Sequence, residues 1–348
     1  MAVTMRDVAK KAGVSPVVVS RVLHGRASTV RVSPSTAERV RQAAQELGYR
    51  CNVFARSFRD GQTLNIGILH GIGFARPVFS QGSRYFAALM DGLIEGAFRH
   101  GYSVTLCPKL MGGSPAEGIN DGRFDGLVWY STMPVEENLR MLLASRVPLV
   151  LIHTPSSLLQ NRFPSVRCDN VGGIRLAVEH LWNLGHRRIA YVTEESTPFM
   201  ETQERIAAFR KWMAEFGAPV DESDILACPR SRHAETIDRY LSEGPRHTAV
   251  VCQHDGVADT VIRRARLFGI RVPEHLSVVG FDSTAFCDEV EPPLTSVSQP
   301  LVNIGSQAID LLVRCIRGET PEPLDLVLPC GLDVRGSTAT PASHPKVD

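Results

Sequence analysis

Apolar residues recur at helical spacing in three short segments of the first fifty residues. Gly13 follows the first segment, and glycine commonly ends helices. Ser-Pro pairs at 15–16 and 33–34 open the next two segments, since serine is a good N-cap and proline fits the first helical turn. The pattern therefore predicts three helices, over about residues 5–12, 16–23 and 34–47.

Residues 51–62 follow a different pattern, with space for about two helical turns. Asn52 can cap a helix there, and Asp60 with Gly61 can end it. A helix this short is not stable alone in water. We therefore expect a hinge that is helical only when another surface holds it.

From residue 64 onward, short apolar runs alternate with longer helical segments. The runs typical of strands are 65–69, 103–107, 126–129, 148–152, 189–192, 225–228, 249–252 and 277–279. The helical segments are 85–100, 136–144, 171–184, 203–216, 234–241 and 256–268. This alternation predicts an α/β fold of two doubly wound parallel-sheet lobes, like those of periplasmic binding proteins.

These elements predict a helical head, a hinge and two lobes. The expected boundaries are 1–50 for the head, 51–62 for the hinge, 63–164 with 294–330 for the first lobe, 165–293 for the second lobe and 331–348 for a tail. The end of that tail, from Thr338, is expected to be frayed. Parallel sheets bind ligands outside the carboxyl ends of their strands, so a small ligand is expected between the lobes.

Charge is divided unevenly between these parts. The 348 residues carry a formal net charge of +1, but residues 1–62 hold 11 Lys and Arg against 4 Asp and Glu. The remaining residues hold 27 Lys and Arg against 33 Asp and Glu. A basic head on a mildly acidic body indicates that the head meets a polyanion.

Composition excludes several other classes of protein. A hydrophobic share of 43% is ordinary for a globular protein, and no uncharged run is long enough to span a membrane. The charged N-terminus does not fit an export signal, so we expect a cytoplasmic protein. The 8 cysteines are scattered singly, which favours reduced core thiols over a metal site.

Enzyme signatures are missing as well. Gly71 and Gly73 lack the third glycine of a dinucleotide loop, and His180 and His186 do not share a helical face. The sequence has no phosphate loop, no HExxH and no Gly-x-Ser-x-Gly. We therefore expect no enzymatic activity, no cofactor and no resident metal.

The head has the spacing of a helix-turn-helix. Ala9, Gly13, Val19 and Val22 stand at successive offsets of 4, 6 and 3 residues. The small Ala lets two helices approach, the Gly permits a tight turn, and the two Val residues pack one helix on the other. DNA binding explains both this spacing and the positive charge. The alternative, a small helical accessory domain, leaves the charge unexplained.

Longer motifs extend this interpretation to the whole chain. The head contains TMRDVAKKAGVSPVVVSRVLHG and VSPSTAERVRQAAQELGYRCNVFARSFRDGQT. The body contains DNVGGIRLAVEHLWNLGHRRIAYV, ERIAAFRKW, GIRVPEHLSVVGFDS, PPLTSVSQP and VRGSTA, in that order. These motifs resemble the LacI/GalR (lactose-repressor-like) family of bacterial transcription regulators.

The resemblance implies that the second helix of the head lies in the major groove of DNA. The implied DNA-contacting residues are Thr4, Ser15, Pro16, Val17, Ser20, Arg21, His24, Asn52 and Phe58. Arg21 can form two hydrogen bonds with guanine, whereas Pro16 and Val17 suit thymine methyl groups. Phe58 stands where the family inserts an apolar wedge into the minor groove. The alternative for Phe58 is packing against a lobe.

The resemblance also implies an effector site between the lobes. Arg205 and Asp282 align with effector-contacting residues and supply a planar donor fork and a carboxylate acceptor. Tyr85 and Phe86 match aromatic positions that stack on the ligand. The alternatives are a structural ion pair for the first two and core packing for the aromatic residues.

Two histidines depart from the family pattern in this site. His153 replaces a common Asp, and His254 replaces a common Asn. Together with Arg205 they shift the expected charge of the site toward positive. This predicts an effector that carries a carboxylate or a phosphate, such as a sugar acid or a sugar phosphate.

The sequence as a whole predicts a ligand-responsive, DNA-binding repressor of a carbohydrate or related catabolic operon. We expect a homodimer on a near-palindromic operator, because a two-fold dimer pairs two half-sites and no heptads follow Arg335. Two alternatives stay open. A solute-binding protein shares the two-lobed fold but needs an export signal, and a sugar-metabolising enzyme needs catalytic residues.

Overall fold

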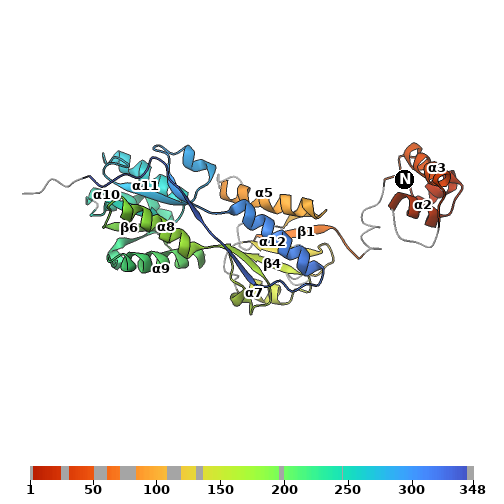
Figure 1. Cartoon of the computed structure of the whole chain (residues 1–348), viewed down its shortest axis with the longest axis horizontal. Helices are drawn as coiled ribbons and strands as arrows, with labels where there is room; N and C mark the ends of the chain where they lie inside the picture. Colours follow the sequence, from red (N-terminus) through yellow and green to blue (C-terminus); the bar gives the residue numbers. More distant parts are fainter. Residues whose placement is uncertain are drawn as a thin grey trace, which may run out of the picture. The chain divides into compact units, whose positions relative to one another are not determined.

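The computed structural model describes residues 3–24, 31–50, 61–70, 84–107, 119–130, 136–195, 200–244 and 246–342. The chain divides into two compact units, Met1–Thr63 and Leu64–Asp348 (Figure 1). The first unit is a helical head, and the second contains two α/β lobes. In the part of the chain that is described, no helix is long and apolar enough to cross a membrane.

The head contains the predicted helices α1 (Met5–Ala12), α2 (Pro16–His24) and α3 (Pro34–Glu46). Helix α1 ends at Gly13, whose φ of 66° is a left-handed conformation that glycine adopts without strain. Val8, Val19 and Val40, one from each helix, are buried together. Small alanines surround them and let the helices approach closely, which confirms the helix-turn-helix prediction.

The first lobe is built on a parallel sheet with the strand order β11-β5-β4-β3-β1-β2. Its strands are β1 (Asn65–His70), β2 (Ser103–Cys107), β3 (Gly126–Tyr130), β4 (Leu149–Ile152), β5 (Ser165–Cys168) and β11 (Asp325–Leu328). Its helices are α5 (Arg84–Arg99), α7 (Glu136–Leu143) and α12 (Leu301–Ile316). Helices α5 and α12 lie side by side (Figure 1) because Gly92 leaves room for the Val302 backbone.

The second lobe has the strand order β12-β10-β9-β8-β6-β7, parallel except for β12. Its strands are β6 (Ile189–Glu195), β7 (Ile225–Pro229), β8 (Ala249–Cys252), β9 (Ser277–Asp282), β10 (Thr295–Ser298) and β12 (Gly331–Asp333). Its helices are α8 (Asn170–Asn183), α9 (Met200–Glu215), α10 (His233–Ser242) and α11 (Asp255–Leu267). Two apolar cores fill the space between this sheet and its helices.

The chain passes between the lobes from β5 to α8, from β10 to α12 and from β11 to β12. The expected lobe boundaries are therefore wrong at two strands. Strand β5 pairs within the first sheet, although 165–293 was expected to form the second lobe. Strand β10 pairs with β9 in the second sheet, although 294–330 was expected in the first lobe. Each crossing is only a few residues long, and the amino-acid composition does not change there. The positions of the lobe boundaries could therefore not be predicted from the sequence.

The expected tail at 331–348 is also wrong over its first part. Strand β12 pairs with β10 in the second sheet. The Ser337 hydroxyl donates to the Val278 carbonyl oxygen at 2.6 Å, and the Ala339 N–H donates to the Ser277 hydroxyl at 3.1 Å. Thr338 lies within hydrogen-bond distance of His180, at 3.0 Å. This segment therefore completes the second lobe, because its backbone and hydroxyl groups pair with neighbouring strands.

Candidate DNA-binding surface and ligand site

Helix α2 presents its first residues to solvent. Ser15, Pro16 and Val17 are exposed, with Val17 58% accessible, whereas Val19 is buried on the inner face. Arg21 lies one turn after Val17, on the same side of the helix. No hydrogen bond or ion pair joins its guanidinium to another of the described residues.

Thr4 and Ser15 act as helix caps. The Thr4 hydroxyl accepts the N–H of Asp7 at 3.4 Å, and the Asp7 carboxylate accepts the Thr4 N–H at 2.8 Å, which completes a capping box. The Ser15 hydroxyl accepts the N–H of Val18 at 3.4 Å. These two residues therefore fix the starts of α1 and α2 in addition to any contact with DNA.

The remaining residues of the expected DNA-contacting set are placed only in part. Ser20 is half-buried on α2. His24 is the last residue of that helix, and its side chain lies outside the described part of the structure. Asn52 and Phe58 lie outside the described residues altogether. Their roles stay predictions.

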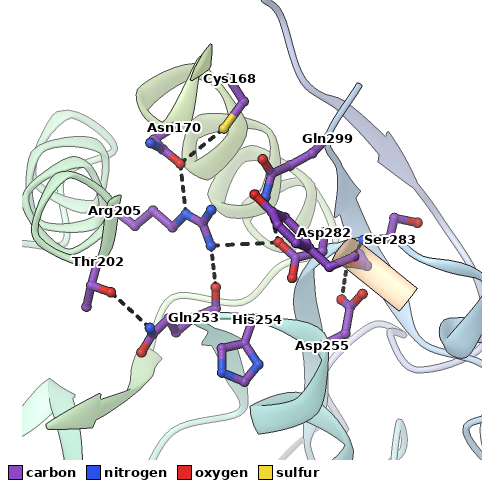
Figure 2. Close-up of polar contacts among 12 residues, drawn as sticks. Cys168, Asn170, Thr202, Arg205, Gln253, His254, Asp255, Asp282, Ser283 and Gln299 are labelled. Atoms are coloured by element: carbon purple, nitrogen blue, oxygen red, sulfur yellow. Dashed lines mark hydrogen bonds and ion pairs between the residues drawn. The ribbon is translucent and has the colours of Figure 1, made fainter. Parts of the chain in front are cut away.

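Arg205, on α9, lies at the centre of the candidate ligand site and is only 7% exposed. Its Nε donates to Oδ1 of Asn170 at 2.8 Å, and its Nη1 donates to the carbonyl oxygen of Gln253 at 2.7 Å (Figure 2). Its Cζ lies 3.6 Å from the centre of the Phe281 ring, a cation–π contact. These contacts fix the guanidinium plane and leave Nη2 with no hydrogen bond to the described residues.

Asp282 ends strand β9 and faces Arg205 (Figure 2). Its Oδ1 lies 4.0 Å from Nη1 of Arg205 and accepts a hydrogen bond from Nε2 of Gln299 at 2.6 Å. Burial and the charge of Asp255 raise the pKa of Asp282 to about 8, against the opposing effect of Arg205. Near neutral pH this carboxyl group can therefore donate as well as accept hydrogen bonds.

His153 follows strand β4 in the first lobe, with a left-handed φ of 63°. A hydrogen bond joins its Nε2 to the Tyr85 hydroxyl, whereas its buried Nδ1 has no partner among the described residues. Burial lowers the pKa of His153 to about 3, with a further contribution from the Arg205 charge. The imidazole is therefore neutral at physiological pH and has one free hydrogen-bonding nitrogen.

Phe86 packs with its neighbours in the first lobe. Its ring centre lies 5.3 Å from that of Tyr130, and both residues contact the apolar core of the lobe. Tyr130 in turn lies edge-on to the His153 ring, with 6.2 Å between the centres. Phe86 therefore has core packing as one role, the alternative that the sequence left open.

His254 is the N-cap of helix α11. Its Nδ1 accepts the N–H of Val257 at 3.3 Å. Burial keeps His153 neutral at physiological pH, so His153 adds no positive charge to the site. Of the three residues expected to make the site positive, His153 is therefore uncharged.

Residues from both lobes contribute to one polar site. The charge of Asp282 adds to the effects of burial and Tyr130 that raise the pKa of Tyr85, and Arg205 lowers that of His153. Such effects are strong only between close groups shielded from water. The structure therefore brings together Tyr85 and His153 from the first lobe with Arg205 and Asp282 from the second.

Sequence reasoning missed three amide side chains in this site: Asn170, Gln253 and Gln299. Each comes within two residues of the end of a strand, β5, β8 or β10 respectively. A polar residue at the carboxyl end of a buried strand is a signal that could have found them. Two were missed because β5 and β10 themselves were not predicted.

Metal ligands and disulfides are not found in the described part of the chain. No group of His, Cys, Asp and Glu side chains there could hold a metal ion. The free cysteines are Cys168, Cys228, Cys252, Cys287, Cys315 and Cys330. The candidate site therefore offers a ligand hydrogen bonds, one guanidinium charge and aromatic rings.

Two family models match the chain: "Bacterial regulatory proteins, lacI family" over residues 4–52 and "Periplasmic binding protein-like domain" over residues 178–338. A helix-turn-helix head on a two-lobed body with a buried polar site defines the class of ligand-binding DNA regulators. The chain is 30% identical to catabolite control protein A of Priestia megaterium, over 97% of this chain and 100% of the relative. The chain belongs to the LacI family of bacterial regulatory proteins.

Other relatives agree with this assignment. The chain is 31% identical to the HTH-type transcriptional repressor PurR of Vibrio parahaemolyticus, over 92% of this chain and 93% of the relative. Its fold is similar to that of the lac repressor dimer bound to operator and the anti-inducer ONPF, with a TM-score of 0.80 and 25% identity. The match covers 97% of this chain and 100% of the lac repressor chain. The transcriptional regulator CelR in complex with cellobiose gives a TM-score of 0.68 at 30% identity, and the match covers 96% of this chain and 99% of the CelR chain. The chain is a DNA-binding transcription regulator and not an enzyme.

Proposed function

We propose that this regulator is a homodimeric repressor of a carbohydrate or related catabolic operon, acting in the bacterial cytoplasm on nucleoid DNA. Two heads bind a near-palindromic operator, because a two-fold dimer pairs two half-sites. A ligand between the lobes changes operator affinity through the hinge at 51–62. Relatives named as repressors, and the lac repressor dimer bound to operator, support this arrangement.

In the head, we propose Arg21 as the residue that reads guanine, since its guanidinium has no partner within the described residues. Pro16 and Val17 are exposed on α2 and suit thymine methyl groups. Phosphate contacts are proposed for Thr4, Ser15, Ser20, His24 and Asn52. Phe58 is proposed as a wedge in the minor groove.

The effector that the geometry supports best is small, uncharged and rich in hydroxyl groups. The proposal rests on two unused hydrogen-bonding groups in one buried site, Nη2 of Arg205 and Nδ1 of His153. Beside them lies the Asp282 carboxyl group, whose Oδ1 already accepts from Gln299 and whose raised pKa lets it donate as well as accept. This mixture of donors and acceptors suits a polyhydroxylated ring. The cellobiose complex of CelR and the ribose-bound relative from Enterococcus faecium support a sugar.

A sugar acid or sugar phosphate is the second candidate. An anion could pair with Arg205, because the neighbouring Asp282 carboxyl is protonated below its raised pKa of about 8. The neutral His153 removes one of the charges that favoured an anion. The two candidates therefore differ mainly in the charge of the ligand.

Calorimetry with matched ligands separates the two candidates. A thermal-shift screen of the full chain against sugars, sugar acids and sugar phosphates first identifies a ligand. The matched pair of that ligand, such as glucose and glucuronate, is then titrated. We expect the neutral member to bind at least about tenfold more tightly, a difference of roughly 1.4 kcal/mol. Tighter binding of the acid would replace the first candidate with the second.

A further inference from the structure

A second hollow lies where β5 passes into α8, one of the crossings between the lobes. It has a volume of about 410 Å³, and its walls come from β5 and β11 of the first lobe and from α8 and α9 of the second. Asn170 lines it, but Arg205, Asp282 and His153 do not. The hollow is therefore a neighbour of the effector site and not a part of it.

Part of the lining is apolar and open to solvent. Val171 is 39% exposed and Val327 is 43% exposed, although large apolar side chains are usually covered. Ala207, on the adjoining helix α9, is exposed beside them. Exposed apolar side chains around a concave surface are typical of a binding site.

The hollow also contains two cationic side chains, Arg167 and Lys211. Nη1 of Arg167 donates to Glu204 at 3.0 Å, but its buried Nε has no hydrogen-bond partner within the described residues. Lys211 is 54% exposed, and its Nζ lies 3.9 Å from the Glu215 carboxylate and 4.5 Å from the centre of the Trp212 ring. A buried guanidinium N–H without an acceptor is costly, so an acceptor supplied by a ligand would be favourable.

The acidic side chains of the lining are already engaged. Glu204 accepts hydrogen bonds from Arg167 and, at 2.7 Å, from Nδ2 of Asn170. Asp169 caps helix α8 by accepting the N–H of Gly172 at 2.8 Å. Within the described residues, the unsatisfied polar group of the hollow is therefore Nε of Arg167, and Lys211 adds an exposed positive charge.

We propose that this hollow is a second ligand site, for a small organic anion with an apolar body and one carboxylate. The apolar body contacts Val171, Val327 and Ala207, and the carboxylate pairs with Nε of Arg167 and with Lys211. Asn170 connects the two sites, since its Oδ1 accepts from Arg205 (Figure 2) and its Nδ2 donates to Glu204. The second ligand would thus bind within one side chain of the effector site.

Fluorine NMR on the full chain tests the proposal with 4-fluorobenzoate as the probe and 4-fluorobenzamide as its uncharged counterpart. Ala207→Trp fills the hollow, and Gln203→Trp places the same side chain one turn earlier on α9, outside the lining. Both positions are exposed, so both variants are expected to fold, and circular dichroism checks this. Lys211→Met removes one cation from the hollow.

We expect saturable binding of 4-fluorobenzoate to the wild-type chain and to Gln203→Trp. Its dissociation constant should rise at least about tenfold in Ala207→Trp and about threefold or more in Lys211→Met, and 4-fluorobenzamide should bind at least about tenfold more weakly. Equal binding of the amide or the absence of saturable binding would overturn the proposal. Equal affinity of Ala207→Trp and Gln203→Trp would also overturn it, because the probe would then occupy another site such as that of Arg205.

Discussion

Burial changes the charge of the residues in the candidate ligand site. It raises the pKa of Asp282 to about 8, and it lowers the pKa of His153 to about 3. Each shift favours the uncharged form of the side chain. A site that looks rich in charge from its residue types therefore presents mostly neutral donors and acceptors near neutral pH, as a polyhydroxylated ligand requires.

The raised pKa of Asp282 gives a prediction for stability. Its folded value of about 8 lies above its ordinary value of 3.8, so the folded state holds a proton that the unfolded state releases. The stability of the wild-type chain therefore falls as pH rises between these two values. Relative to wild type, Asp282→Asn should gain free energy of unfolding from about pH 5 to pH 8, on the order of 1 kcal/mol or more. Urea denaturation at several pH values measures this gain, and a constant difference would contradict the raised pKa.

Arg21 gives a prediction for DNA recognition. Arg21→Ala should lose about 1–3 kcal/mol of discrimination between operator and scrambled DNA while non-specific affinity changes little. Fluorescence anisotropy with both DNAs measures the two affinities. Arg41→Ala is the control, because it removes the same charge from α3, where Arg41 pairs with Glu38 at 3.0 Å. Equal losses of specific and non-specific affinity in Arg21→Ala would rule out base reading.

Among the elements, the α5–α12 contact depends on glycine. A Cβ atom on Gly92 would lie 1.9 Å from the carbonyl oxygen of Val302, so Gly92→Ala forces the two helices apart. We expect this variant to lose about 3 kcal/mol of stability, the upper end of the usual range for overpacking. Gly101→Ala is the control, since Gly101 has a φ of 75° but no atom within 4 Å of the added Cβ. Its backbone strain should cost only about 1–2 kcal/mol. Thermal unfolding compares the stability of the two variants. Equal losses of stability in Gly92→Ala and Gly101→Ala would contradict the close contact between α5 and α12.

Most elements with regular patterning could be predicted from the sequence, whereas those at the crossings could not. Helix α12 was missed although its apolar residues recur at helical spacing. The head helices have apolar periodicity, caps and glycine stops, and α1, α2 and α3 form as predicted. Strands β5, β10, β11 and β12 are only 3 or 4 residues long and contain polar residues, so their apolar signal is weak. Their sheet assignment depends on tertiary pairing, which periodicity does not report.

The same limit applies to the candidate site. Arg205 and Asp282 could be singled out through the motifs that contain them, and the structure brings them together. Asn170 and Gln299 follow strands that the sequence did not reveal. The neutral state of His153 depends on burial by residues distant in the chain, so its residue type alone gave the wrong charge.

At the scale of the whole molecule, the site joins two lobes that are connected by three chain crossings. A ligand that contacts both Arg205 and His153 contacts both lobes, so it binds one arrangement of the lobes better than another. Such a difference in affinity allows an effector to change DNA binding. Coupling of this kind is typically about 1–3 kcal/mol, or roughly 5–150-fold in affinity.

Operator affinity, with and without the ligand found in the thermal-shift screen, tests this account most directly. The full chain first selects its own site from a random DNA library, and fluorescence anisotropy then gives the affinity for that site. At saturating ligand we predict a change of at least about fivefold for the wild-type chain, and no such response in Asp282→Asn. Operator affinity that stays the same at saturating ligand, in a chain that binds the ligand by calorimetry, would contradict the account.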